Sequence, residues 1–159
     1  MKISLPLPKL GALVLAILAL LATLIFGQAS TSASINYGEE VSEVAKRYVG
    51  APYKWGGTTP KGFDASGFTQ YIYKKAATKM TIPRTSALQY KIGKTVKQKD
   101  LKQGDLVFYA TGQKGKVSFV GIYSGNGRFI AATSKGVKVA KMSDKYWKQR
   151  YIGAKRVIK

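Results

Sequence analysis

The sequence contains no cysteine and no histidine among its 159 residues. No disulfide can form, so the fold must be held together by its hydrophobic core. Zinc sites built from cysteine and histidine are excluded, and no metal or cofactor is expected. Catalysis by a Cys–His or Ser–His pair is excluded as well, because the chain has no thiol and no imidazole.

Acidic residues are also scarce: seven Asp and Glu stand against 27 Lys and Arg, and the formal net charge is +20. Five of the seven acids fall in one predicted helix or in polar turns, which leaves Asp64 and Asp105. Glycoside hydrolysis needs two carboxylates placed on either side of one bond. The sequence argues against a glycosidase but does not exclude one.

The N-terminal residues have the composition of a secretory signal. Lys2 and Lys9 precede an almost unbroken apolar stretch over residues 11–26, and small residues follow. This order of a basic start, an apolar middle and a small-residue end is typical of signal peptides. We therefore predict a signal peptide over residues 1–33 and one domain over residues 34–159.

Two features of this signal stay open. Cleavage after Ala29 and cleavage after Ala33 both satisfy the small-residue rule. An uncleaved membrane anchor is the alternative, because a helix over residues 9–27 approaches the roughly 20 apolar residues that span a bilayer. Since no cysteine follows the apolar stretch, a diacylated lipoprotein is excluded.

The positive charge is spread along the whole predicted domain. Setting aside Lys2 and Lys9 lowers the formal charge from +20 to +18. Such a surface attracts polyanions, and the candidates for an exported protein are phosphate-bearing wall polymers, anionic lipid headgroups and extracellular nucleic acid. The alternative is that the charge serves solubility alone. Nucleic-acid binding has no further support, because no recognition motif accompanies the charge.

Helices are predicted in the first half of the domain and strands in the second. Helices are expected from Asn36, over 65–75 and from Thr85 or Ser86 to before Gly93, from apolar residues at helical spacing and from polar caps. Strands are expected over 106–109, 117–123, 128–132, 137–140 and 151–157, joined by turns at 124–127 and 134–136, with a helical turn at 143–150 in which Tyr146 and Trp147 cover the end of the sheet. Helices followed by an antiparallel meander indicate an α+β domain.

Six sequence blocks resemble the NlpC-type cell-wall peptidases in order and spacing. They are Pro52-Tyr53-x-Trp55-Gly56-Gly57, Gly62-Phe63-Asp64-x-Ser66-Gly67-Phe68, Pro83-Arg84-Thr85-Ser86, Gly104-Asp105-Leu106-Val107-Phe108, Val120-Gly121-Ile122-Tyr123-x-Gly125-Asn126-Gly127 and Tyr146-Trp147-x-x-Arg150-Tyr151. The resemblance covers about residues 37–159. It implies a papain-like α+β fold, and members of this family cut the peptide stems of peptidoglycan.

The three positions that carry the family's reaction differ in this chain. By the same resemblance, Ala65 stands at the cysteine nucleophile, Phe119 at the general-base histidine and Ala131 at the histidine that orients the base. A methyl group cannot attack a carbonyl, and neither Phe nor Ala can carry a proton. The resemblance therefore implies a family member without the family's catalytic groups. In the alternative interpretation Phe119 faces the core and the strand register is shifted by one residue.

Four positions that contact ligand in the family are retained, namely Tyr53, Asp64, Ser66 and Arg84. Each also has a structural interpretation: Tyr53 packs, Asp64 caps a helix and Arg84 binds backbone carbonyls. Ser66 is expected to cap the helix and to bind ligand rather than to act as a nucleophile with a lysine base. The Trp55-Gly56-Gly57 segment is interpreted as a turn fixed by its backbone geometry.

Three functions follow as hypotheses. The leading one is an exported, catalytically inactive relative of these peptidases that binds peptidoglycan stems or anionic wall polymers. The second is a regulator that contacts a wall hydrolase or another protein partner in the envelope. The third is a hydrolase of stem peptides with a different catalytic apparatus.

Overall fold

The computed structural model describes residues 36–76 and 78–159, which belong to one compact unit, Ile35–Lys159. The predicted signal peptide over residues 1–33, with its alternative as an anchor, lies outside the described residues. Within the described ranges, no helix combines the length and the apolar character needed to span a membrane.

The helices begin where the sequence supplies a polar cap. Asn36 accepts a hydrogen bond from the backbone N–H of Glu39 at the start of the first helix, Asp64 caps the second and Thr85 caps the third. The helices, in chain order, are Tyr37–Lys46 (α2), Ala65–Lys75 (α3), Ser86–Gln89 (α4), the 3₁₀ turn Gln98–Asp100 (η1) and Lys145–Lys148 (α5).

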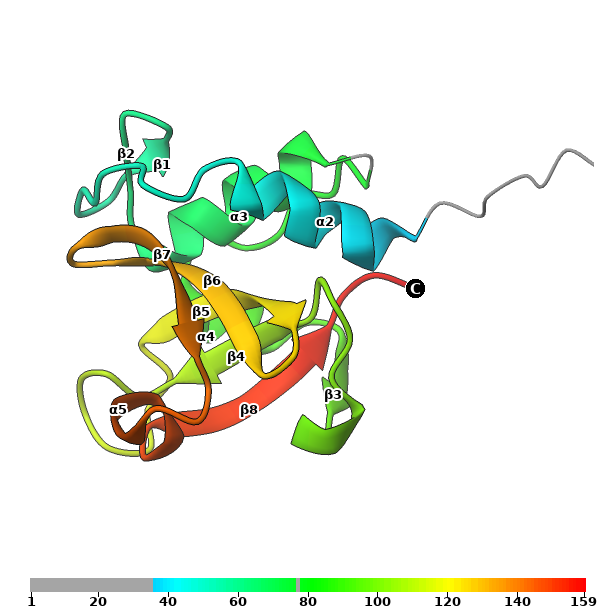
Figure 1. Cartoon of the computed structure of the whole chain (residues 1–159), viewed down its shortest axis with the longest axis vertical. Helices are drawn as coiled ribbons and strands as arrows, with labels where there is room; N and C mark the ends of the chain where they lie inside the picture. Colours follow the sequence, from blue (N-terminus) through cyan, green and yellow to red (C-terminus); the bar gives the residue numbers. More distant parts are fainter. Residues whose placement is uncertain (1–35, 77) are drawn as a thin grey trace, which may run out of the picture. The chain divides into compact units, whose positions relative to one another are not determined.

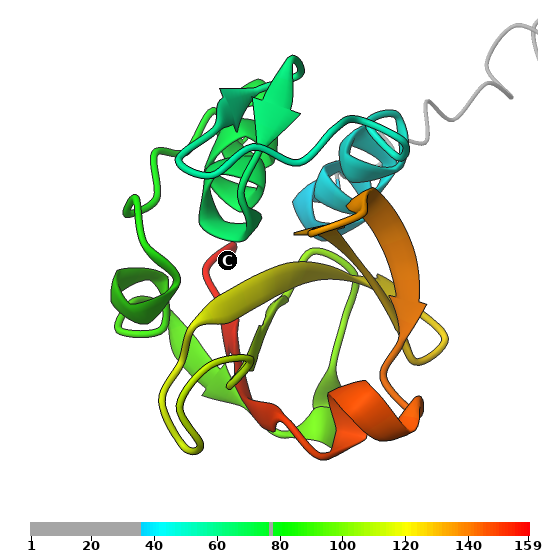
Figure 2. The same cartoon turned by 90° about the vertical axis from the view of Figure 1, so that its left-hand side faces the viewer.

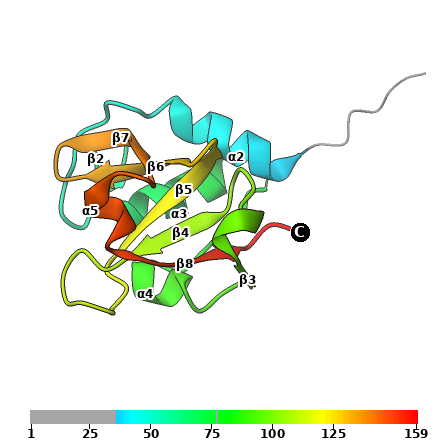
Figure 3. The ribbon, with the colours of Figure 1, turned by 60° about the horizontal axis from the view of Figure 1, so that its bottom comes forward.

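Two antiparallel sheets complete the domain. The strands are Thr58–Thr59 (β1), Gly62–Phe63 (β2), Lys94–Val96 (β3), Leu106–Tyr109 (β4), Phe119–Gly125 (β5), Arg128–Thr133 (β6), Gly136–Lys141 (β7) and Tyr151–Arg156 (β8). β1 and β2 form a small hairpin, and the main sheet has the order β3-β8-β4-β5-β6-β7. Figure 3 shows β6, β5, β4 and β8 following one another across this sheet.

The helices and the main sheet form two layers. α2 and α3 contact β5 and β6, and in Figure 1 both helices run along the same side of the sheet. Figure 2 shows α5 at the opposite side of the curved sheet. Phe68 and Ile72 of α3 and Val41 of α2 are fully buried in the resulting core. The α+β, papain-like architecture expected from the sequence is confirmed.

A second packed cluster consists of aromatic side chains that α5 completes. Trp147 packs with ring centroids 5.0 Å from each of Tyr109, Phe119 and Phe129. Tyr109 and Phe119 are direct partners in the β4–β5 register, so their side chains share a face of the sheet. Such ring pairs stabilise a core by more than their buried area alone. The prediction that Tyr146 and Trp147 cover the end of the sheet is confirmed for Trp147, whereas Tyr146 is 46% exposed and its ring contacts that of Trp147.

Candidate functional site

A cavity of about 1010 Å³ opens where the start of α3 meets the turn before α4, the start of β5 and the β6–β7 turn. Its lining joins segments that are distant in the sequence. The lining residues are Tyr53, Trp55, Gly56, Asp64, Ala65, Ser66, Arg84, Thr85, Ser86, Ala87, Thr111, Val117, Ser118, Phe119, Ala132, Thr133, Ser134, Lys135, Tyr146 and Trp147. All four residues predicted to bind ligand are therefore brought to one cavity.

The positions expected at the reaction centre lie in or next to this cavity. Ala65 is the first residue of α3 and Phe119 the first of β5; both line the cavity, and each is 9% exposed. Ala131 lies on the same face of the sheet as Phe119, because a Cβ added to Gly121, two residues after Phe119, would lie 3.1 Å from the Cβ of Ala131. Ala131 is fully buried and does not line the cavity, whereas its neighbour Ala132 does.

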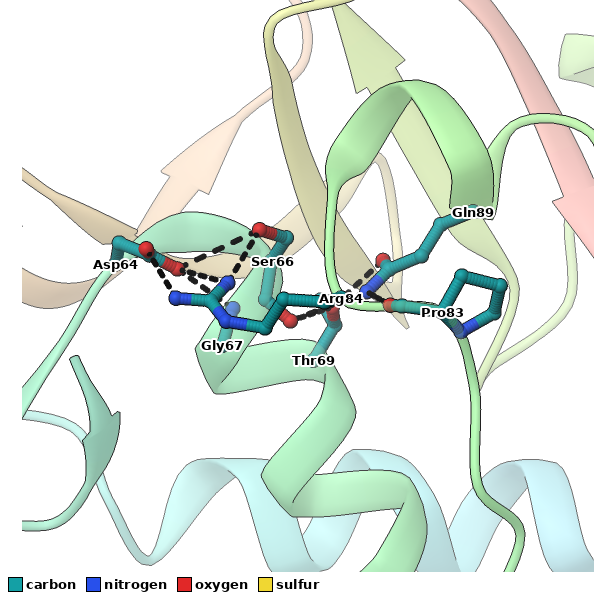
Figure 4. A network of polar contacts seen from close by, with 7 residues as sticks. All are labelled: Asp64, Ser66, Gly67, Thr69, Pro83, Arg84 and Gln89. Carbon is teal, nitrogen blue, oxygen red and sulfur yellow. Dashed lines mark hydrogen bonds and ion pairs between the residues drawn. The ribbon is translucent and has the colours of Figure 1, made fainter. Parts of the chain in front are cut away.

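Asp64, Ser66 and Arg84 form one polar cluster at the cavity wall (Figure 4). Nη2 of Arg84 lies 2.6 Å from Oδ2 of Asp64, and Nη1 lies 3.0 Å from Oδ1. Nη1 also donates to the Ser66 hydroxyl at 3.0 Å. A guanidinium that binds a carboxylate through two parallel hydrogen bonds holds both groups in a fixed orientation. The alternative in which Arg84 binds backbone carbonyls is not what the structure shows.

The cap of α3 is Asp64 and not Ser66. Oδ1 of Asp64 accepts the backbone N–H of Gly67 at 2.7 Å, which is the usual N-cap hydrogen bond. The expectation that Ser66 caps this helix is wrong, because Ser66 already lies inside the first turn. Its hydroxyl instead contacts Oδ1 of Asp64 at 3.4 Å and the guanidinium of Arg84. Within the described residues no lysine hydrogen-bonds to this hydroxyl.

The described charged residues that line the cavity are one acid and two cations. Among the described residues, Asp64 is the only acid that lines it, so these residues offer no carboxylate pair of the kind that glycoside hydrolysis needs. The hydrogen bonds to Asp64 raise the pKa of the Arg84 guanidinium above its usual value, so Arg84 stays charged while paired. Lys135 is the other cation in the lining, and within the described residues its ammonium group makes no ion pair.

Gln89 lies next to the polar cluster and links its segments. Its role was not predicted from the sequence. This fully buried side chain donates to the carbonyl oxygens of Ser66 at 3.1 Å and of Pro83 at 2.7 Å. It accepts from the hydroxyl of Thr69 at 2.8 Å. Gln89 thereby fastens the first turn of α3 to the segment that carries Arg84 (Figure 4). A polar residue within a four-residue helix gave no signal of this role.

The rim of the cavity carries exposed aromatic side chains. Tyr53 is 37% exposed and Trp55 is 87% exposed, and both line the cavity. The turn that contains Trp55 and Gly57 is closely packed against the backbone of Gly62. A Cβ on Gly57 would meet the carbonyl oxygen of Gly62, so this position requires glycine. Tyr146 and Trp147 also line the cavity. The sequence predicted their packing on the sheet but not their place in this lining.

Comparison with known proteins gives a consistent result. The sequence profile of the NlpC/P60 family matches residues 50–156 of the chain. The probable peptidoglycan endopeptidase LytE of Bacillus subtilis (strain 168) is 45% identical over 124 residues, which cover 77% of this chain and 35% of that protein. The murein DD-endopeptidase MepH of Escherichia coli (strain K12) is 41% identical over 115 residues, which cover 69% of this chain and 42% of that protein.

The structural comparison agrees with the sequence comparison. The crystal structure of an NlpC/P60 family protein from Bacillus cereus ATCC 10987 superposes with a TM-score of 0.71 at 36% identity. The superposition covers 77% of this chain and 40% of that one. The chain thus spans less than half the length of each of these three proteins.

Proposed function

The chain belongs to the NlpC/P60 family, and we propose that this member is a catalytically inactive protein of the cell envelope that binds the peptide stems of peptidoglycan in its cavity. Two of its relatives are a murein endopeptidase and a probable peptidoglycan endopeptidase. In this proposal the protein binds the same kind of ligand as these relatives, a peptide of the cell wall, but does not cleave it.

The observation that carries the proposal is the composition of the cavity wall. The polar cluster of Asp64, Ser66 and Arg84 is complete and fixed by hydrogen bonds. Next to it stand the methyl group of Ala65 and the ring of Phe119. A nucleophile and its base are both needed for acyl transfer, and the chain contains neither cysteine nor histidine to provide them elsewhere. This combination supports binding without cleavage.

A serine mechanism has little support from the geometry of Ser66. Its hydroxyl oxygen accepts a hydrogen bond from Arg84, a cation that cannot take up a proton. Asp64 is the other contact, at 3.4 Å, and its carboxylate is already engaged by Arg84 and by the N–H of Gly67. A group that is to remove the serine proton should instead hold the hydroxyl in a short hydrogen bond.

The ligand side of the proposal rests on charge and shape. A stem peptide carries free carboxylates, and Lys135, an exposed lining residue that forms no ion pair with any described residue, offers them a cation. The exposed rings of Tyr53 and Trp55 provide apolar surface beside it. Lysine contacts at an exposed rim contribute modestly and are weakened by salt, so the fixed polar cluster is expected to give most of the specificity.

The test combines binding and turnover on the purified full-length chain. Defined muropeptides are titrated by calorimetry, and the same mixtures are incubated overnight and analysed by mass spectrometry. We expect saturable binding, loss of most of it in Arg84→Gln, unchanged binding in the exposed control Lys61→Gln, and no new products. Cleavage that disappears in Ser66→Ala would show an active hydrolase, and absence of muropeptide binding would remove the binding proposal.

A further inference from the structure

A second cavity, of about 540 Å³, shares no lining residue with the first. It is formed by the β5–β6 turn, the end of β7, the end of α5 and the segment around η1. Its lining residues are Gln98, Leu101, Tyr123, Asn126, Gly127, Arg128, Lys141, Met142, Ser143, Lys148 and Tyr151.

Of the residues that the structure describes, three cations and no acid line this second cavity. They are Arg128, Lys141 and Lys148, and all three are exposed. Within residues 36–76 and 78–159, none of them forms an ion pair. Water and dissolved ions therefore balance the charges of these three side chains.

Two of these cations are placed against each other. Arg128 and Lys141 are direct cross-strand partners in the β6–β7 register. Side chains at such positions have Cβ atoms about 5 Å apart, and like charges there are destabilising. An anion bound between them would relieve this repulsion.

Neutral hydrogen-bond donors complete the lining. The side chains of Gln98, Asn126 and Ser143 line the cavity, and in the described part of the chain none of the three has a hydrogen-bond partner. The turn that carries Asn126 is itself held in place. The N–H of Gly127 donates to the Tyr123 hydroxyl at 3.0 Å, and the N–H of Met142 donates to the carbonyl of Gly127 at 2.8 Å.

The neighbouring acids do not neutralise the cavity. Asp105 is 2% exposed and is bound by Arg156, with Nη2 to Oδ2 at 2.7 Å. Asp100 and Asp144 are close in sequence to lining residues but do not line the cavity themselves. Besides the apolar atoms of Leu101, Met142, Tyr123 and Tyr151, the described lining residues thus present cations and neutral amide or hydroxyl groups to a ligand, and no carboxylate.

We propose that this second cavity binds the phosphodiester groups of an anionic wall polymer. A phosphate group has several acceptor oxygens, which match a guanidinium, two ammonium groups and neutral donors arranged around one space. Single-stranded nucleic acid would also require rings on which bases stack. The ring of Tyr151 packs against that of Tyr109, with centroids 5.7 Å apart, which leaves Tyr123 as the one other aromatic ring among the described lining residues. A polymer without bases therefore fits the lining better.

The site gives the protein a second attachment point that is independent of the cavity next to α3. A chain that binds a stem peptide in one cavity and a polymer phosphate in the other binds the cell wall more tightly than either cavity does alone, because the first contact raises the effective concentration for the second. The phosphate site does not depend on the proposed stem-peptide function, because the two cavities have separate linings.

The experiment uses the full-length chain and a synthetic oligomer of glycerol phosphate joined by phosphodiesters. The test variant is Arg128→Gln, Lys141→Gln and Lys148→Gln combined. The control, Arg47→Gln, Lys61→Gln and Lys75→Gln combined, removes the same charge from exposed residues that line neither cavity. Calorimetry at low salt should show binding at least about tenfold weaker in the test variant and within about twofold of the wild type in the control.

Three outcomes would overturn the proposal. Equal weakening in both variants would show that overall charge and not this cavity binds the oligomer. Unchanged binding in the test variant would show that the oligomer binds elsewhere. Tighter binding of a single-stranded DNA oligonucleotide, lost in the test variant, would assign the site to nucleic acid. Each variant is first checked for wild-type circular dichroism.

A second measurement needs no variant. In the wild type, addition of the oligomer should shift the backbone amide signals of Asn126, Gly127 and Ser143 and leave those of Ser66 and Arg84 in place. Shifts confined to the α3 cavity would contradict the proposal. Muropeptide titration should show the opposite pattern, so failure of either proposal is seen separately.

Discussion

Asp64 combines two structural tasks in one side chain. It caps α3 through Gly67 and forms the ion pair with Arg84. The side chain of Asp64 is 18% exposed and that of Arg84 is 38% exposed, so water screens the ion pair and its net contribution to stability is modest. The cap hydrogen bond is local to the helix and should contribute at least as much.

Two substitutions of Asp64 should separate these tasks. Asp64→Asn keeps a capping oxygen and loses the charge, so we expect it to lower the free energy of unfolding by about 1 kcal/mol or less. Asp64→Ala loses both and should cost about 1 kcal/mol more. Urea denaturation measures the difference. Equal loss in the two variants would show that the cap contributes nothing measurable here.

At this scale the sequence predicted the members of the site but not all of their contacts. The resemblance placed Tyr53, Asp64, Ser66 and Arg84 correctly in one cavity. It did not reveal that Arg84 binds Asp64, because 20 residues separate them and sequence carries no distance between them. Which of Asp64 and Ser66 caps the helix depends on backbone angles at one residue, and Asp64 has the extended conformation of an N-cap.

At the scale of secondary structure, the short helix α4 holds the start of α3 in place through hydrogen bonds. This helix has only four residues, too few for stability of its own. Its attachment comes from Gln89, which bridges the carbonyls of Ser66 and Pro83. Gln89 therefore helps to position the Arg84 segment, together with Gln70 of α3, whose side chain donates to the carbonyl oxygen of Ile82 at 2.8 Å.

Gln89→Leu tests this attachment. Leucine fits a buried position but leaves the carbonyl of Pro83 without this donor and the hydroxyl of Thr69 without this acceptor. We expect the free energy of unfolding to fall by about 2 kcal/mol. Muropeptide binding should weaken as well, because the segment carrying Arg84 is no longer fixed. Chemical denaturation and calorimetry measure the two effects.

The matched control is Gln113→Leu, at an exposed position of the loop between β4 and β5. It should leave both stability and binding close to those of the wild type. If the two variants behave alike, Gln89 does not hold the turn.

Strong periodicity and turn chemistry made most elements predictable. The helix over Ala65–Lys75 and the strand over Leu106–Tyr109 have the predicted bounds. The turn at Gly125, Asn126 and Gly127 has the positive φ angles that its residues favour. β3 was missed because Lys94 and Thr95 are exposed, and this edge strand is defined by pairing with β8 rather than by an apolar pattern.

The net charge of the whole molecule can be calculated from the sequence without knowledge of the fold. The cations are dispersed, yet the structure distinguishes those in ion pairs, such as Arg84 and Arg156, from the group that lines the second cavity, which forms no ion pair within the described part of the chain. The location of that group depends on the β6–β7 register, which opposes Arg128 and Lys141. Sequence spacing of 13 residues does not show this contact, and only the folded sheet does.

The absence of histidine and cysteine also has a consequence for pH dependence. Apart from the α-amino group, no side chain of the sequence belongs to a type whose ordinary pKa lies between about 5.5 and 8. Burial raises the pKa of Tyr73 and Tyr109 still further from neutrality. The net charge of the protein should therefore stay constant across this range, since lysines and arginines remain protonated and carboxylates ionised.

Binding of a phosphodiester polymer should accordingly be insensitive to pH and sensitive to salt. The charge of a phosphodiester is also constant near neutrality, so we expect the dissociation constant for the glycerol phosphate oligomer to change by less than about twofold between pH 6 and pH 8. Raising the salt from 0.05 M to 0.5 M should weaken binding strongly, because exposed cations are screened. Calorimetric titrations at fixed ionic strength measure the first effect and a salt series the second. A steep change in affinity near pH 7 would require a titrating group in the site, and because this chain supplies none of the ordinary kind, that result would contradict an attachment based on permanent cations.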